Sequence, residues 1–173
     1  MPKTNILLSQ ADIQQRIISL AAEIERDYPA SHGIHLVAIL KGGFMFMADL
    51  VRAMSERVTM DFMAVSSYGK GTTSSGQVRV LKDLDSNVEG RHVILVEDIV
   101  DTGLTLHYLQ DLLKARAPLS LKTACLLSKP SRRKVDVQVD YIGFTIEDHF
   151  VIGYGLDFDE KYRNLPYIAI LEQ

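Results

Sequence analysis

The sequence predicts an α/β fold in which helices flank a largely parallel β-sheet. Short apolar runs alternate along most of the chain with segments of helical periodicity, as in strand–helix–strand units. Two of these runs, at 34–40 and 93–96, lead through short glycine-containing turns into apparent helices. From Lys129 onward the short apolar stretches have no clear helix between them. We therefore expect a small hood of short strands over one end of the sheet.

The composition is typical of one globular domain, which we expect to span residues 1–173. Its core is expected over about 34–128, and its hood mainly over 129–173 with the N-terminal segment. The 173 residues are 47% hydrophobic and 24% charged, with a formal net charge of −3. This charge argues against a nucleic-acid or membrane-surface partner, and no apolar run reaches the ~20 residues that span a bilayer. With Cys125 as the single cysteine, we expect a cytoplasmic protein.

Periodicity and apolar runs place the elements of the first half. Apolar residues recur at helical spacing after Ser9, which is a suitable N-cap. The run ending at Leu40 is short and apolar enough for a buried strand. The predicted elements are a helix at 10–27, a strand at 34–40, a helix at 44–54 and a strand at 58–65.

A polar segment interrupts this order at 66–77, with the sequence SSYGKGTTSSGQ. It is too polar to pack in a core and too long for a tight turn, so we expect a mobile loop. A returning strand at 78–81 would make this loop the tip of a long hairpin.

The second half begins with another strand and helix and ends in short strands. The predicted elements are a strand at 92–96, a helix at 103–116 and strands at 121–127, 140–144, 151–154 and 167–171. We expect the last three strands to fold over one end of the sheet.

The most informative segment is 93–105, with the sequence VILVEDIVDTGLT. A buried strand at 93–96 is followed by two acids, Glu97 and Asp98, where the strand is expected to end. The turn at 101–105 then leads into a helix. Free backbone N–H groups, the helix dipole and threonine hydroxyls would together bind a phosphate there. The acids suit sugar hydroxyls or a phosphate-bound metal ion.

This segment resembles the phosphoribosyl-pyrophosphate (PRPP) motif of the type I phosphoribosyltransferases. The resemblance implies the parallel-sheet fold of that family, with a hood and a flexible catalytic loop. It also implies that Glu97 and Asp98 bind the ribose hydroxyls and Mg²⁺. The 5-phosphate would lie on the turn formed by Asp101, Thr102, Gly103, Leu104 and Thr105. Some relatives have a lysine in place of Leu104, so the phosphate affinity is open.

From about Leu40 to its end, the chain further resembles the hypoxanthine-guanine subgroup of that family. The resemblance assigns pyrophosphate binding to Lys41, Gly42 and Arg163, and a non-proline cis bond before Lys41 is frequent in the family. It assigns purine binding to Lys129, Phe150, Val151 and Asp157, with Asp157 also a metal ligand. Ser67 and Tyr68 match the start of the lid, and residues 68–77 are then expected to be poorly ordered without ligand.

These resemblances imply a magnesium-dependent purine salvage enzyme with Asp101 as general base. It would transfer the phosphoribosyl group of PRPP to N9 of hypoxanthine or guanine, giving IMP or GMP and pyrophosphate. A lysine donor opposite position 6 would favour an oxo group over the amino group of adenine. The family also implies a homodimer or homotetramer, and the apolar start of the helix at 44–54 is a candidate interface.

Alternatives remain open from the residues alone. Lys129 is by itself more typical of a solvated lysine, Phe150 of core and Arg163 of a weak surface ion pair. Asp101 is equally suited to cap the helix that follows. At the level of function, the alternatives are a phosphoribosyltransferase for another base and a PRPP-sensing regulator that binds nucleic acid.

Overall fold

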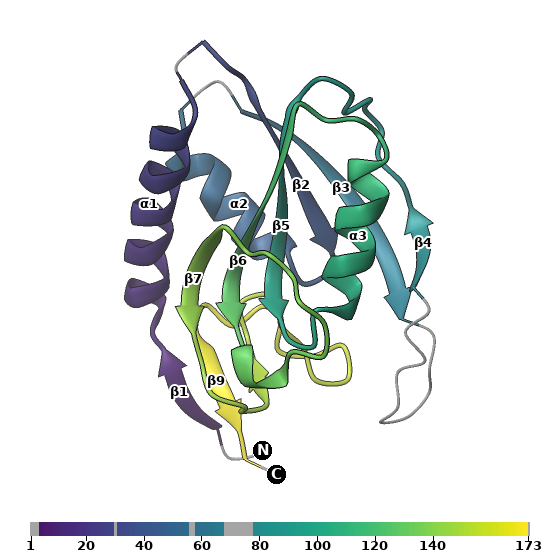
Figure 1. The fold of residues 1–173 in the computed structure, drawn as a ribbon. Coiled ribbons are helices and arrows are strands. Elements are labelled where there is room, and N and C mark those ends of the chain that lie inside the picture. Colours follow the sequence, from purple (N-terminus) through teal and green to yellow (C-terminus); the bar gives the residue numbers. More distant parts are fainter. Residues whose placement is uncertain (1–3, 30, 56–57, 68–77, 173) are drawn as a thin grey trace.

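The structure, a computed structural model, describes residues 4–29, 31–55, 58–67 and 78–172. Two sheets and three α-helices form the described part of the chain (Figure 1). The helices are α1 (Gln10–Asp27), α2 (Phe44–Ala53) and α3 (Leu104–Lys114), with a 3₁₀ turn at Pro130–Arg132. The strands are β1 (Thr4–Leu8), β2 (Ile34–Leu40), β3 (Val58–Ser67), β4 (Val78–Lys82), β5 (His92–Val100), β6 (Ser120–Ser128), β7 (Tyr141–Thr145), β8 (Val151–Ile152) and β9 (Ile168–Leu171).

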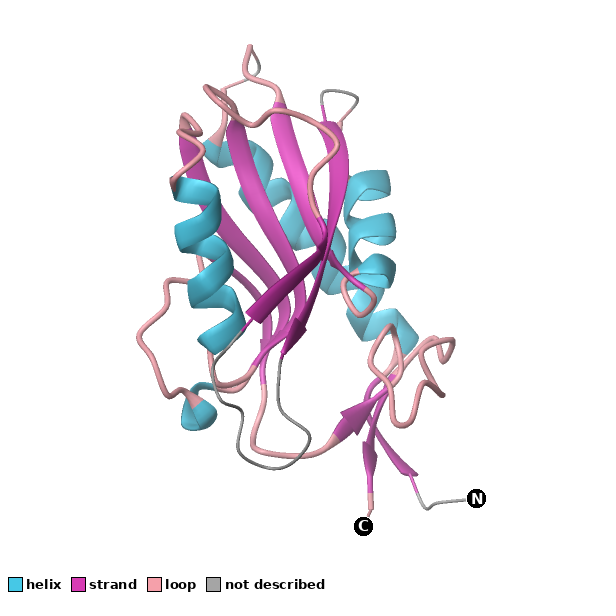
Figure 2. Cartoon of the chain, turned by 90° about the vertical axis from the view of Figure 1, so that its right-hand side faces the viewer, coloured by secondary structure: helices cyan, strands magenta, loops and turns pink. Residues whose placement is uncertain are grey.

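The large sheet has the strand order β4-β3-β2-β5-β6-β7. Strands β3, β2, β5, β6 and β7 are mutually parallel, and only β4 is antiparallel to its neighbour. Helices α1 and α2 cover one face and α3 covers the other (Figures 1 and 2). The predicted α/β class with a mostly parallel sheet is confirmed. The antiparallel β3–β4 pairing confirms the predicted returning strand at 78–81. The predicted loop at 66–77 begins too early, because β3 continues to Ser67.

A small antiparallel sheet, in the order β1-β9-β8, lies below the carboxyl ends of the parallel strands (Figure 1). It includes β8 and β9, two of the three strands expected to fold over this end. The expectation is wrong for the strand at 140–144, because β7 pairs parallel with β6 and extends the large sheet. Strand β1 has no counterpart among the predicted elements. Its apolar run, at 6–8, is only three residues long, which is too short to predict a strand by itself.

The local sequence explains where helix α1 begins and which face of it is buried. Ser9 and Asp12 form the capping box of α1, in which each side chain accepts from the other residue's backbone N–H. The buried face of α1 repeats at helical spacing through Ile13, Ile17 and Ile24. No helix in the described part of the chain is long and apolar enough to cross a membrane.

Candidate active site

Strand β5 brings the two adjacent acids to the site as part of the sheet. The predicted strand end at Val96 is wrong, since β5 continues to Val100. Ile99 and Val100 extend the parallel ladder along β6, and Glu97 is paired with Cys125. Successive strand residues point to opposite faces of a sheet. The side chains of Glu97 and Asp98 therefore lie on opposite faces at this edge.

Both carboxyl groups lie in an environment that favours the neutral form. Burial and, secondarily, the charge of Asp98 raise the pKa of Glu97 well above its ordinary value. Burial raises the pKa of Asp98 to about 6, against the opposing effects of the Ile99 N–H and of Arg163. Asp157 adds a further raising effect on Asp98. A cation bound at this point would favour the ionised form of both carboxyl groups.

The turn after β5 forms a small pocket at the start of α3. Gly103 stands directly before the helix with φ +83°, a left-handed conformation that favours glycine. A Cβ at this position would also lie 3.0 Å from Cγ2 of Val137. The pocket is lined by Glu97, Ile99, Val100, Asp101, Thr102, Gly103, Thr105 and Leu106. Leu104 is the first residue of α3, and its N–H donates to Oγ1 of Thr102 over a long 3.4 Å. The N–H groups of the first turn of a helix suit an anion.

Two arginines that the sequence analysis missed hold this turn. The Arg133 guanidinium donates to the carbonyl oxygens of Val100 and Asp101 and to the Ser128 hydroxyl. Arg132 Nε donates to Oδ1 of Asp101 over 3.2 Å. The two arginines lie three and four residues after Lys129. Two adjacent arginines so close to a predicted site residue could have indicated their role from the sequence. One carboxylate oxygen of Asp101 is thereby engaged.

The loop after β2 lies directly against Asp98. The Leu40–Lys41 peptide bond is cis, as the family resemblance implies. A Cβ on Gly42 would stand 1.7 Å from Oδ2 of Asp98, so only glycine permits this approach. On its other side, a Cβ on Gly155 would stand 2.2 Å from the Gly42 carbonyl oxygen. The 41–43 loop, β5 and the segment at 155 thus meet at one point.

Arg163 and Asp157 join the same point. Arg163 Nη2 lies 2.9 Å from Oδ1 of Asp157, and Nη1 donates to the Gly155 carbonyl oxygen over 2.7 Å. Glu160 bridges the two cations, with 2.6 Å to Nζ of Lys41 and 3.4 Å to Nη2 of Arg163. The structure therefore brings both predicted pyrophosphate-binding cations together, and Glu160 is a contact that sequence reasoning missed.

Lys129 is buried, in contrast to the solvated lysine that its type alone suggests. Only 6% of the residue is exposed. Its ammonium donates to the His149 carbonyl oxygen and lies 3.7 Å from Oδ1 of Asp148. Asp148 in turn lies 3.6 Å from Nη1 of Arg132. An alternating chain of charges therefore connects Lys129 with Asp101.

Phe150 and Val151 come directly after Asp148 and His149 in the sequence. Phe150 is 43% exposed, which rules out the alternative of a core phenylalanine, whereas Val151 is buried in β8. The ring of Phe158 packs edge-to-face on Phe150, with 5.8 Å between centroids. Phe158 is itself 48% exposed. Two exposed aromatic rings in contact suit a planar ligand, and Phe158 escaped the sequence analysis because it lies in an acidic turn.

The predicted lid is described only at its start. Ser67 is the last residue of β3 and pairs with Val78 of β4. Tyr68 and the rest of the predicted lid, through residue 77, lie outside the described residues.

The predicted metal ligands remain a prediction. Within 4–29, 31–55, 58–67 and 78–172, no three or more His, Cys, Asp or Glu side chains are grouped to hold a metal ion. Mg²⁺ usually takes only one or two protein carboxylates and completes its shell with water and substrate phosphates. The carboxylates of Glu97, Asp98 and Asp157 match that chemistry.

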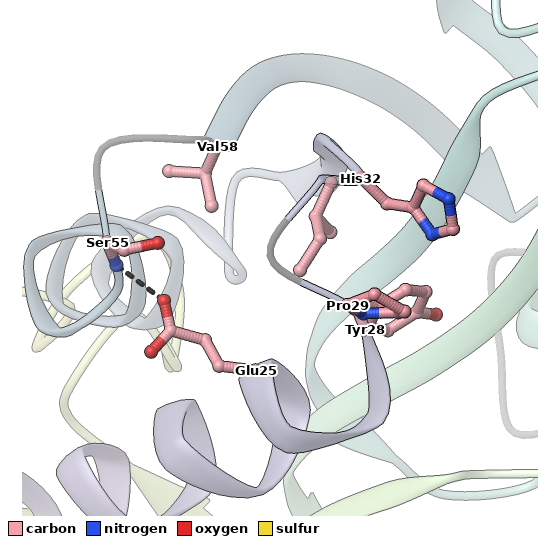
Figure 3. Close-up of a pocket in the computed structure, with 7 residues that line it drawn as sticks. Glu25, Tyr28, Pro29, His32, Ser55 and Val58 are labelled. Carbon is pink, nitrogen blue, oxygen red and sulfur yellow. Dashed lines mark hydrogen bonds between the residues drawn. The ribbon is translucent and has the colours of Figure 1, made fainter.

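Another pocket lies at the opposite end of the parallel strands. Its lining comes from the end of α1, the starts of β2 and β3 and the residue Ser55 after α2 (Figure 3). There Glu25 Oε1 accepts from the Ser55 N–H over 2.6 Å. None of the predicted site residues lines it, so it is separate from the site at the carboxyl edge.

Comparisons with known proteins agree with this geometry. The family model described as phosphoribosyl transferase domain matches residues 3–159. The hypoxanthine-guanine phosphoribosyltransferase of Streptococcus thermophilus (strain CNRZ 1066) is 49% identical over 168 residues, which cover 97% of this chain and 93% of the relative. The enzyme of that name from Aquifex aeolicus is 49% identical over 170 residues, covering 98% and 96%. A crystal structure of a Bacillus anthracis hypoxanthine-guanine phosphoribosyltransferase aligns with TM-score 0.94 and 48% identity, covering 99% of this chain and 100% of that one.

Fold and site define an α/β protein with a turn suited to an anion, an acid pair and two cations at one edge of a parallel sheet. The matched family model and the nearly full-length relatives specify this class further. The chain belongs to the phosphoribosyltransferase family.

Proposed function

We propose that this chain transfers the 5-phosphoribosyl group from PRPP to N9 of hypoxanthine or guanine, giving IMP or GMP and pyrophosphate. The observation that carries the proposal is the meeting of three receptors at one sheet edge: the turn at 101–105, the Lys41 and Arg163 cations, and the buried Lys129. The near full-length relatives that are named for this activity support it.

The 5-phosphoribosyl group of PRPP binds at the turn between β5 and α3. Backbone N–H groups at the start of α3 and the hydroxyls of Thr102 and Thr105 bind the 5-phosphate. Glu97 and Asp98 accept hydrogen bonds from the two ribose hydroxyls. Their negative charge also stabilises the positive charge that develops on the ribose carbon as pyrophosphate leaves.

The pyrophosphate leaving group binds to the two cations, Lys41 and Arg163, near Asp98. The Lys41 and Arg163 cations and the backbone N–H groups of Lys41 and Gly42 bind the pyrophosphate. Glu97, Asp98 and Asp157 would hold Mg²⁺ together with substrate oxygens, and the ion would supply neutralising charge for the departing group. The proximity of Asp98 and Asp157, through which the charge of one raises the pKa of the other, supports a cation between them.

The purine binds beside Lys129 and Phe150. Lys129 donates to the 6-oxo group, Phe150 stacks on the base, and the backbone of Val151 reads its edge. Asp101 accepts the proton of N7 as N9 attacks the ribose carbon. The lid that starts at Ser67 and Tyr68 excludes water during transfer. A cytoplasmic location is supported by the single buried cysteine, Cys125.

The test is a spectrophotometric assay with PRPP and magnesium, run separately with hypoxanthine, guanine, xanthine, adenine and uracil. We expect turnover of hypoxanthine or guanine and a fall of roughly 10²- to 10⁴-fold in Asp101→Ala, the range for a lost general base. Turnover of adenine or uracil alone would sink the purine assignment but leave the PRPP site. PRPP binding without turnover of any base would favour a PRPP-sensing regulator.

A further inference from the structure

Glu160 contacts both cations that we assign to the pyrophosphate. Its Oε2 lies 2.6 Å from Nζ of Lys41, and its Oε1 lies 3.4 Å from Nη2 of Arg163. The Lys41 ammonium lowers the pKa of the Glu160 carboxyl below its ordinary value, so Glu160 is an anion at neutral pH. Both cations are therefore paired with an anion that belongs to the chain.

The local backbone directs Glu160 to this position. Phe158 and Lys161 exchange backbone hydrogen bonds of 3.1 Å and close a tight turn. Within it, Asp159 and Glu160 take left-handed φ angles of +53° and +61°. The Glu160 N–H donates to Oδ2 of Asp157 over 2.9 Å, which fixes the turn against the site. The placement of the Glu160 side chain thus follows from a defined turn.

Asp159, the neighbour of Glu160, provides a matched comparison. It has the same charge and the same backbone region, yet its carboxylate lies 3.4 Å from Lys161 and contacts neither Lys41 nor Arg163 among the described residues. A general effect of negative charge near the site would be shared by both residues. An effect that requires contact with the two cations belongs to Glu160 alone.

We propose that Glu160 is a resident competitor of pyrophosphate: its carboxylate occupies Lys41 and Arg163 in the empty enzyme, leaves them when the pyrophosphate of the substrate binds, and returns as the product departs. The inference rests on the proposed function of the site. Displacing an existing ion pair weakens pyrophosphate binding, and the returning carboxylate promotes product release. The Lys41–Glu160 pair is largely exposed, at 68% and 66%, so the effect is modest.

Calorimetric titration of inorganic pyrophosphate with magnesium into the full-length wild type, Glu160→Gln and Asp159→Asn tests the inference. Glutamine keeps the shape of glutamate and removes its charge, while one acceptor oxygen becomes an N–H₂ donor. We expect Glu160→Gln to bind pyrophosphate about two- to fivefold more tightly than Asp159→Asn, as for loss of an exposed ion pair. Steady-state assays should show tighter product inhibition by pyrophosphate and an unchanged KM for the purine.

A double-mutant cycle then locates the effect. In a Lys41→Met background, the gain from Glu160→Gln should shrink, because the closer cation is gone. Equal pyrophosphate affinity of Glu160→Gln and Asp159→Asn, or weaker binding by Glu160→Gln, would overturn the competitor role while leaving the proposed function standing. A wild type that binds no pyrophosphate would instead overturn the pyrophosphate subsite and the inference together.

Discussion

Lys129 shows how burial changes the function available to a charged side chain. A buried ammonium needs hydrogen-bond partners, and here they are the His149 carbonyl oxygen and Asp148. Both partners lie one or two residues before Phe150, so the lysine is fixed beside the exposed ring. A donor held in place in this way recognises a carbonyl oxygen on a planar ligand more selectively than a mobile surface lysine would.

Lys129→Met should lower kcat/KM for hypoxanthine roughly 10- to 100-fold, the range for a lost hydrogen bond from a charged donor. Discrimination against adenine should fall as well, because the Lys129 ammonium would no longer face the 6-amino group of adenine, which is also a donor. Lys134→Met, an exposed lysine of the same segment, is the control and should change neither. The measurements are kcat/KM for both bases and PRPP binding by calorimetry. Unchanged discrimination in Lys129→Met would contradict the assignment.

The ion pair between Arg132 and Asp101 shows what residue type alone could not decide. Asp101 suits either a helix cap or a general base, and its contact with Arg132 Nε engages one carboxylate oxygen. The cap residue of α3 is Gly103, which has no side chain, and the Leu104 N–H donates to Thr102 rather than to Asp101. The capping alternative therefore has no support in the geometry, whereas the role of Asp101 as base stays a proposal for the kinetic test.

At the scale of elements, a buried carboxylate connects β3 to the turn that precedes β5. Asp61 accepts backbone N–H groups from Phe62, Asp85 and Ser86 at 2.7 to 2.9 Å. Burial alone would raise the pKa of Asp61, but these three donors and nearby Lys82 outweigh it, so the pKa lies below its ordinary value. A lowered pKa contributes stability above the unfolded value, and that stability is lost as pH falls through the folded value.

Asp61→Asn should therefore cost about 1–3 kcal/mol of unfolding free energy at neutral pH, because an amide N–H₂ would face a backbone donor. The difference from wild type should narrow as the pH falls below about 4, where the wild-type carboxyl also becomes protonated. Urea unfolding at pH 7 and pH 3 measures both values. The control is Asp85→Asn, whose side chain is 80% exposed and which should change little. If the loss of unfolding free energy in Asp61→Asn were the same at both pH values, the stability would not depend on ionisation of Asp61, which would contradict this prediction.

The elements also show where sequence patterns sufficed. Helix α1 begins and ends where Ser9 and the apolar repeat predict, because a capping box and an amphipathic face are local properties. Strand β5 runs past its predicted end, because its last pairs depend on β6 and not on its own residues. Strand β7 joins the large sheet for the same reason, since pairing with β6 decides which sheet a short apolar segment enters.

At the scale of the whole molecule, the start of α2 remains the candidate interface. Phe46 and Met47 are buried against the sheet, whereas Phe44 is 47% exposed at the first position of the helix. An apolar side chain in this state is compatible with contact to a second copy. The expected homodimer or homotetramer thus stays a prediction that solution measurements can decide.

Phe44→Ser should shift the mass measured by light scattering toward the monomer, most clearly on dilution, because the interface would lose an apolar contact. Leu119→Ser is the control, since Leu119 is 64% exposed at the opposite end of the strands. A wild type that is monomeric at every concentration would refute the expectation of an oligomer. An unchanged mass in Phe44→Ser would place the interface elsewhere.

The sequence by itself determined the α/β class, most element boundaries and which turn we propose to bind a phosphate. These depend on periodicity, caps and contiguous residue types, which are local along the chain. Only the tertiary structure decided that Asp98, Gly42, Gly155 and Arg163 meet at one point, that Lys129 is buried, and that Arg132 and Glu160 engage the predicted site residues. Such contacts join segments up to 119 residues apart, and the packing of those segments, not any local pattern, sets which charges come within hydrogen-bond distance.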